Sequence, residues 1–394
     1  MQAMIGDVPP AVSVLMTTWN GAGGNGAGGN GAGGNGAGGN AAAGNGGGGD
    51  GPSRGGGFIG AAIASVLAQS FTDFELIVVD DGSTDATPSV LAGIGDPRLR
   101  VLRQAANGGV VAARNAGLAA ARGRYVAALD HDDLSHPHRL ARQVAYLDAH
   151  PGVVLVATEI EIEAAGRRTA PDHPTGGEPA LIRWLLHVDN PLTWSSVMFR
   201  ADAVRRLGIF MRPAFELADD FDFFHRLLAI GDIARLDEVL TVYRWHAHNT
   251  THGREDALNA NAVKVLAGAY APLLGDDAQD AATLVIRHLS DRKPVRDGAT
   301  LARLGGYLTR LLAGFGAAHA IDARGLAALE AVTGAIWWRT ARAAIRSGVP
   351  GLLRQYRGQP GLAAAFQPVP GDMVRAMAVG AARRVLRRQT GGPG

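Results

Sequence analysis

The sequence predicts an α/β fold, with a mostly parallel sheet and flanking helices in about the first 250 residues and an α-helical region after them. Two observations support this prediction. Between residues 11 and 157, short runs of β-branched and apolar residues alternate with amphipathic segments, the order typical of parallel strand–helix–strand units. After about residue 252 the chain is rich in alanine and leucine and shows no strand pattern. We therefore expect a first domain over 1–251 and a helical region over 252–394.

Buried strands are expected where runs rich in β-branched and apolar residues end in a change of composition or a polar turn. The first, 11–18, ends in Trp19-Asn20, and the second, 74–79, ends in an acidic turn. A helix is expected where apolar residues recur at helical spacing, as they do in 58–69. By the same criteria, further strands are expected at 99–102, 125–128, 153–157, 194–200 and 240–244, further helices at 85–91, 110–118, 137–150 and 218–227, and a loop at 166–179.

A low-complexity segment lies between the first strand and the first helix. Residues 21–40 are four copies of Gly-Ala-Gly-Gly-Asn, and a less regular glycine-rich piece continues to Gly57. This composition buries too little apolar surface to offset the entropy of ordering, so we expect a disordered insertion over 21–57. A phosphate-binding loop is the less favoured interpretation, because it needs one defined glycine pattern that opens a helix.

Composition excludes some classes of protein. The 394 residues include no cysteine, which rules out disulfides and thiolate metal sites. The first residues lack a basic start with an apolar core, and no apolar run reaches the roughly 20 residues of a membrane-spanning helix. We therefore expect a cytoplasmic protein.

Charge is unevenly distributed along the chain. The net charge is +2, but from Arg339 onward there are ten arginines and one acid, Asp372. Near the end, Val374, Met377 and Val385 share a helix face. This pattern predicts peripheral contact with the inner face of a membrane, and an ordinary solvated helix or a frayed tail is the alternative. Nucleic-acid binding is not expected, because no aromatics are interleaved with the last arginines.

The candidate chemistry centres on two acids that follow the strand 125–128. Side chains two residues apart in an extended backbone point to the same side, so Asp130 and Asp132 can converge. Ligands bind at this edge of open α/β sheets, and hard divalent cations prefer carboxylate oxygens. The alternative is a solvated acidic loop in which Asp133 caps the next helix.

The ordered motifs of about the first 250 residues resemble those of the family 2 glycosyltransferases, which have the Rossmann-like GT-A fold. The stretch from Ser13 to Asn20 is similar to the family's first-strand motif, with Thr17 where proline is usual and Trp19 where tyrosine is usual. The acidic helix start, usually Glu-Asp, is Asp219-Asp220 here. The other matching segments are 65–71, 74–85, 107–109, 113–117, 129–133 and 243–246.

The resemblance implies an inverting transfer of a sugar from a nucleotide-diphosphate donor, with uridine as the expected nucleoside. The acceptor would be a hydroxyl of a glycan, a lipid-linked glycan or a protein. The cofactor would be a divalent cation, manganese or magnesium, and Asp220 would act as general base. The implied binding residues are Thr18, Trp19, Asp81, Asn107, Arg114 and Asp130 for the nucleotide sugar, and Asp130, Asp132 and His246 for the metal.

Two other classes of function fit parts of the pattern. A nucleotidyltransferase could use a related fold and a metal-held diphosphate, although the chain shows no basic glycine-rich activating loop near its start. A non-catalytic protein that binds a nucleotide sugar would show binding without turnover. These alternatives are separated by activity measurements rather than by sequence.

Overall fold

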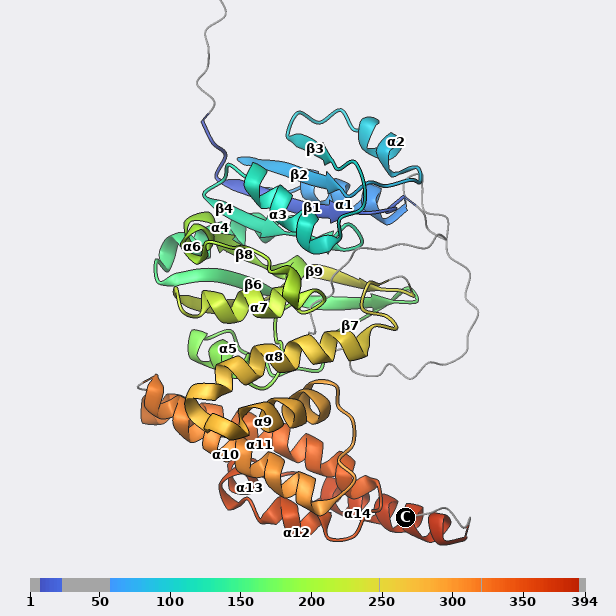
Figure 1. Cartoon of the computed structure of the whole chain (residues 1–394), viewed down its shortest axis with the longest axis vertical. Helices are drawn as coiled ribbons and strands as arrows, with labels where there is room; N and C mark the ends of the chain where they lie inside the picture. The colour runs from blue at the N-terminus through green and yellow to red at the C-terminus, as the bar shows by residue number, and fades with distance from the viewer. Residues whose placement is uncertain (1–7, 23–56, 248, 320, 390–394) are drawn as a thin grey trace, which may run out of the picture. The chain divides into compact units, whose positions relative to one another are not determined.

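The computed structural model describes residues 8–22, 57–247, 249–319 and 321–389 (Figure 1). The predicted insertion over 21–57 therefore lies almost entirely outside the described residues. The chain divides into two compact units. Unit 1 comprises Met1–Arg183 and Asn190–Ala262, and unit 2 comprises Trp184–Asp189 and Val263–Gly394.

A nine-stranded mixed sheet forms the centre of unit 1 within the described residues. Its order is β3-β2-β1-β4-β8-β6-β9-β5, and β7 pairs with β6. β1 pairs in parallel with β2 and β4, and β2 with β3, which confirms the predicted parallel part. β8 runs antiparallel to both β4 and β6. The strands are β1 Val12–Thr18, β2 Phe74–Asp80, β3 Leu99–Arg103, β4 Tyr125–Ala128, β5 Leu134–Ser135, β6 Val153–Ala164, β7 Arg167–Thr169, β8 Met198–Arg200 and β9 Asp232–Trp245.

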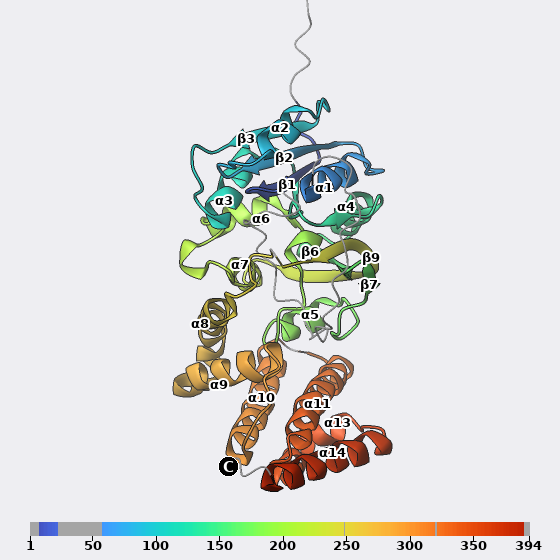
Figure 2. The same ribbon diagram turned by 90° about the vertical axis from the view of Figure 1, so that its right-hand side faces the viewer.

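Helices cover both faces of this sheet, with α1 and α4 on one side of β1 and α3 on the other (Figure 2). Residues alternate between faces along a strand. Val14 accordingly packs in a core with α1 and α4, while Leu15 meets Gly117 of α3 so closely that an added Cβ would lie 2.0 Å from its Cδ1. The helices up to α7 are α1 Gly57–Leu67, α2 Thr87–Ala92, α3 Val110–Ala120, α4 Arg139–Ala149, α5 Pro179–Leu185, α6 Ala201–Leu207 and α7 Asp219–Leu227.

The described ends of the insertion lie against each other. The backbone at Gly57 has a φ of 61°, a conformation that favours glycine. A Cβ added there would come within 2.5 Å of the carbonyl oxygen of Ala22. Ala22 is itself held by its N–H, which donates to Asp85 Oδ2 at 3.2 Å and to Thr87 Oγ1 at 3.0 Å. The chain thus leaves the domain and re-enters it at adjacent points.

Several predicted boundaries are wrong, each for a physical reason. β9 begins at Asp232 rather than at residue 240. The prediction missed the first part of this strand because irregular pairing with β6 interrupts the alternation of buried and exposed residues. β7 occupies part of the predicted loop 166–179, as a short exposed hairpin partner of β6. The predicted strand 194–200 begins with a short 3₁₀ turn, Trp194–Ser196. The short α5 and α6 and the two-residue β5 have no sequence prediction at all.

Unit 2 contains helices joined by loops and no strand among its described residues, which confirms the predicted helical region. Buried tryptophans anchor its core, and Trp184 donates its indole N–H to Thr333 Oγ1 at 2.9 Å. No helix among the described residues is long and apolar enough to cross a bilayer. The remaining helices are α8 Glu255–Leu274, which begins in unit 1, and α9 Ala278–Val285, α10 Gly298–Ala318, α11 Ala323–Arg346, α12 Leu352–Arg357, α13 Pro360–Ala365 and α14 Pro370–Gln389.

Candidate active site

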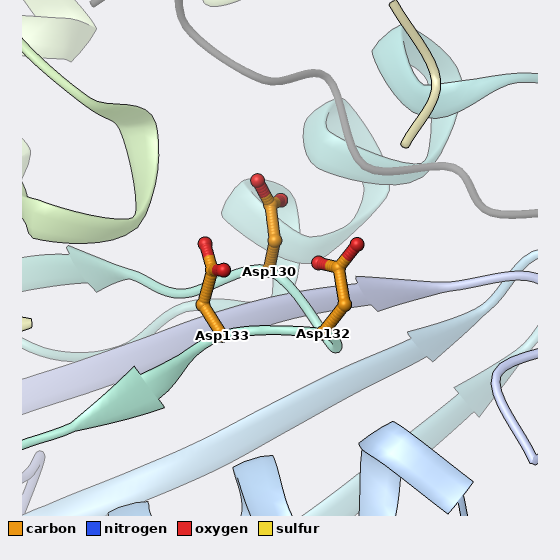
Figure 3. Close-up of side chains that lie close together, drawn as sticks. All are labelled: Asp130, Asp132 and Asp133. Carbon is orange, nitrogen blue, oxygen red and sulfur yellow. The ribbon is translucent and has the colours of Figure 1, made fainter. Parts of the chain in front are cut away.

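Three carboxylates gather in the turn that follows β4. Asp130, Asp132 and Asp133 are buried, and each offers an oxygen within 4.8 Å of those of the other two. Their carboxylates lie on the same side of the turn (Figure 3). The turn is fixed by the backbone, because the N–H of Asp133 donates to the carbonyl of Asp130 at 3.2 Å and the N–H of Asp130 donates to Ser195 Oγ at 3.0 Å.

Asp133 was expected, in the alternative interpretation, to cap the following helix. That expectation is wrong: α4 begins at Arg139, with His138 as its N-cap, and β5 intervenes. Asp133 instead turns inward and accepts the N–H of Arg244 at 2.8 Å through Oδ1. Its Oδ2 has no hydrogen-bond partner among the described residues. A third carboxylate therefore joins the pair predicted from spacing.

The donor set of this cluster fits a hard divalent cation. Burial raises the pKa of Asp130 to about 7, although Arg114 acts in the opposite direction. Burial and the charges of Asp132 and Asp130 raise the pKa of Asp133 well above its usual range. Carboxylates packed this closely in a low-dielectric site repel one another, and a bound cation relieves that repulsion. All-oxygen coordination of this kind suits magnesium or manganese.

The end of β9 supports the cluster from one side. His246 places Nε2 3.1 Å from Asp132 Oδ2, and its ring stacks on Phe58 with centroids 4.5 Å apart. The guanidinium of Arg244 lies 4.7 Å from the centroid of the same Phe58 ring and bonds to the carbonyl of Asp132. Burial would raise the pKa of Asp132, but His131 and His246 more than offset this and hold it below its usual range.

Arg114 connects the cluster to α7. Its side chain is fully buried and donates to Asp219 Oδ2 at 2.8 Å and to Asp130 Oδ1 at 3.3 Å. Its guanidinium also lies 4.1 Å from the ring centroid of Trp194. Burial alone would lower the pKa of Arg114, but the neighbouring carboxylates raise it above its usual value. Arg114 is therefore a fixed cation between two acids.

Asp220 is the second residue of α7 and follows Asp219, the partner of Arg114. Its Oδ1 accepts the N–H of Phe221 at 2.6 Å, and its Oδ2 has no hydrogen-bond partner among the described residues. Burial and the charge of Asp219 raise the pKa of Asp220 to about 7. A buried carboxylate with one unbonded oxygen and a pKa near neutrality is suited to accepting a proton.

The predicted nucleoside residues lie at the carboxyl ends of β1 and β2. Asp81 accepts the N–H groups of Gly108 and Gly109 at 2.8 and 2.9 Å, and its own N–H donates to the carbonyl of Thr18 at 2.9 Å. Trp19 is half-buried and Asn107 is exposed. The structure gives no contact between Asn107 and the acidic cluster.

Thr18 connects these residues to the acidic turn. Its side chain is buried, and Gly21 packs between it and His131: a Cβ on Gly21 would lie 2.5 Å from Thr18 Oγ1 and 2.7 Å from His131 Cδ2. His131 is part of the turn that carries Asp130 and Asp132. The ends of β1 and β4 therefore form one continuous edge of the site.

The fold and these residues define an α/β protein with a candidate nucleotide- and cation-binding site at the carboxyl ends of its parallel strands. Residues 55–208 match the family model described as glycosyl transferase family 2. An uncharacterized glycosyltransferase of Nostoc sp. is 30% identical over 220 residues, which cover 54% of this chain and 68% of that protein. The chain belongs to glycosyltransferase family 2, has its GT-A fold, and is a glycosyltransferase.

Two further comparisons give relatives of more specific description. The succinoglycan biosynthesis protein ExoO of Rhizobium meliloti is 39% identical over 155 residues, 39% of this chain and 42% of that one. This chain thus spans less than half the length of ExoO. The crystal structure of S. aureus TarS 1-349 in complex with UDP-GlcNAc aligns over 96% of this chain and 92% of that one, with 16% identity and a TM-score of 0.48.

Proposed function

We propose that this glycosyltransferase transfers a sugar from a nucleotide-diphosphate donor, uridine-linked, to a hydroxyl of a glycan or lipid-linked acceptor, with inversion at the anomeric carbon. The observation that carries the proposal is the pair of buried acidic centres joined by Arg114. One is the cluster of Asp130, Asp132 and Asp133, which fits a cation. The other is Asp220, whose Oδ2 has no hydrogen-bond partner among the described residues and could accept a proton.

Asp130, Asp132 and His246 would hold the cation, with Asp133 as a further carboxylate. When bound, manganese or magnesium stabilises the negative charge that develops on the leaving diphosphate. The protein would hold the carboxylates that bind the cation in buried, fixed positions. Arg244 fixes the backbone of Asp132, and Arg114 holds Asp130. Thr18, Trp19, Asp81 and Asn107 would bind the nucleoside at the adjoining strand ends.

Asp220 would act as the general base. As the acceptor oxygen forms its bond to the anomeric carbon, its proton passes to Asp220 Oδ2 and the bond between that carbon and the diphosphate oxygen breaks. A single displacement of this kind inverts the configuration and needs no covalent intermediate. A pKa of about 7 for Asp220 places the base near neutral operating pH, where general-base catalysis is most effective.

The acceptor is proposed to be a growing polysaccharide. Support comes from ExoO, which is named for succinoglycan biosynthesis. That protein is more than twice as long as the region it shares with this chain. The acceptor is therefore tested separately from the donor.

The test is donor hydrolysis across uridine-, guanosine- and thymidine-diphosphate sugars, with manganese or with a chelator. We expect slow, manganese-dependent release of one nucleoside diphosphate. Asp220→Asn should lower the rate by about 10²- to 10⁴-fold, the usual contribution of a general base, and leave nucleoside-diphosphate affinity unchanged by calorimetry. Asp202→Asn is a matched control, because Asp202 also accepts the N–H of the next residue at the start of a helix but is exposed.

The outcomes separate the parts of the proposal. Wild-type hydrolysis by Asp220→Asn removes the residue from the mechanism. Hydrolysis that survives chelation removes the metal. Nucleotide binding without turnover on any acceptor would identify a non-catalytic binding protein, and pyrophosphate exchange from a nucleoside triphosphate would identify a nucleotidyltransferase.

A further inference from the structure

Exposed apolar side chains are concentrated on the last helix of unit 2. Among the described residues, ten large apolar side chains are exposed; four of them lie on α14, and a fifth, Val369, immediately precedes it. In a soluble domain such side chains are normally scattered, and a contiguous set marks an interaction surface. The five are Val369 (68% exposed), Val374 (61%), Met377 (38%), Val385 (54%) and Leu386 (58%).

The orientation of α14 is fixed by its opposite face. Ala376 and Gly380 are buried, and a Cβ on Gly380 would collide with the carbonyl oxygen of Ile345 in α11. Arg384 donates to the carbonyl of Gly348 at 3.0 Å and Arg383 to that of Arg346 at 3.2 Å, just where α11 ends. These contacts need small residues and arginines on the packed face, so the larger apolar residues remain outside.

The exposed face has helical regularity. At 100° per residue, one row runs along the side of α14 that faces away from Ala376 and Gly380. Arg375 and Arg384 flank the row on its two sides, and both are exposed. We call the row and its two flanking arginines the α14 face. The row consists of Val374, Met377, Ala378, Ala381 and Val385.

Charge decides which partner suits the α14 face. After Asp372 the chain contains five arginines and no acid. In a symmetric contact between two copies, the same surface would meet itself, and these cations would be brought together. Nucleic-acid phosphates would pair with the arginines but leave the apolar row without a partner. An anionic bilayer satisfies both features, because its headgroups attract the arginines and its acyl region accepts the apolar side chains.

We propose that the α14 face docks this glycosyltransferase on an anionic lipid bilayer, as a helix lying in the interface with its apolar row toward the acyl chains. The proposal is independent of the proposed reaction, since it uses none of the site residues. It places the enzyme where a lipid-linked acceptor would be available.

The test is flotation of the full chain with vesicles of phosphatidylcholine alone or with roughly one-third phosphatidylglycerol. We expect binding only to the anionic vesicles. Val374→Glu with Val385→Glu should reduce the bound fraction at least about tenfold, because two carboxylates would enter the apolar interface. A matched control replaces two valines of similar exposure elsewhere, Val101 (42%) and Val239 (44%), with Glu and should bind like the wild type.

A second variant isolates the charge. Replacing Arg375 with Gln should weaken binding by about fivefold, since a cation near an anionic surface contributes on the order of 1 kcal/mol. Donor hydrolysis in solution should be unchanged in all these variants, which separates failure of docking from failure of the reaction.

Three results would overturn the proposal. One is equal binding to neutral and anionic vesicles. Another is equal binding by the wild type and the Val374→Glu, Val385→Glu variant. The third is a concentration-dependent dimer in sedimentation velocity that this variant abolishes while no vesicle binding is seen, which would assign the α14 face to a second copy of the chain.

Discussion

Replacing Arg114 with Met should destabilise unit 1 more than any exposed arginine substitution. The guanidinium is fully buried between Asp219 and Asp130, at 2.8 and 3.3 Å. Met keeps much of the volume but removes the charge, so both carboxylates stay buried without a cation. Removing one partner of a buried ion pair costs about 3–5 kcal/mol. With typical stabilities of roughly 5–15 kcal/mol, the variant should lose a large part of its margin.

The cost should depend on pH in a defined direction. Loss of Arg114 raises the folded-state pKa of Asp130 further above its present value of about 7. A carboxyl group whose pKa is higher in the folded chain stabilises the fold below its unfolded-state pKa of 3.8. This stabilisation is lost as the pH rises through the folded-state pKa. The penalty of Arg114→Met should therefore be largest near pH 8 and smaller near pH 5. Adding Asp219→Asn should recover about 1 kcal/mol or more at pH 8, because one stranded charge is gone.

The assay is urea unfolding of the intact chain followed by circular dichroism at both pH values. Arg142→Met is the control: its side chain is 59% exposed and pairs with Glu238 at 3.0 Å, so its loss should cost no more than about 1 kcal/mol. Equal losses for Arg114→Met and the control would refute the reasoning. So would a penalty for Arg114→Met that does not change with pH.

Three further predictions concern the site and its flanks. Because Asp220 must be unprotonated to accept a proton and its pKa is about 7, kcat/KM for transfer should fall about tenfold per pH unit below that value and level off above it; a flat profile down to pH 5.5 would exclude Asp220 as the base. Phe58→Ala should weaken manganese binding in calorimetry by roughly tenfold, because the ring orients His246. Phe215→Ala is the control, since that ring also lies under an arginine but contacts no candidate ligand; equal effects would contradict the role of Phe58. Deletion of residues 23–56 should change stability by no more than about 2 kcal/mol, because the flanking residues already touch; loss of folding would show that the segment has a structural role.

The parallel part of the fold can be predicted because its strands are buried on both faces. β1 and β2 are rich in β-branched and apolar residues, and every residue in them is buried, as is typical of parallel strands covered by helices on both faces. β9 is harder, because its middle residues Asp237 and Glu238 are charged and exposed and resemble a turn. Its pairing with β6 supplies the order that local sequence does not.

Some residues of the candidate site can likewise be predicted from the sequence, and others cannot. Asp130 and Asp132 can be found from sequence, since both directly follow a buried strand. The backbone there is a turn rather than the expected extended chain, which is why Asp133 joins them. Arg114 and Asp219 are 105 residues apart, and nothing in either segment indicates that they form an ion pair. The contact between Phe58 and His246 also cannot be predicted from the sequence, because it depends on where β9 ends. Their roles in catalysis and metal binding stay predictions until they are measured.

Buried carboxylates with raised pKa values lower the stability of the folded chain at neutral pH, and replacing Asp220 tests this cost. Its pKa is about 7 in the folded chain and 3.8 is the ordinary value, so its contribution to stability is present below pH 3.8 and is lost as pH rises to about 7. A shift of this size corresponds to about 4 kcal/mol, and a buried Asn with an unsatisfied amide would offset roughly 1–3 kcal/mol of it. In urea unfolding at pH 8, Asp220→Asn should therefore be more stable than the wild type by roughly 1–3 kcal/mol. This gain should shrink as the pH falls and become a loss near pH 4, where only the cost of the amide remains. A residue held for packing would show the opposite, since its replacement would lower stability at every pH. A variant that is more stable and inactive would indicate that the protein keeps this carboxylate for its chemistry.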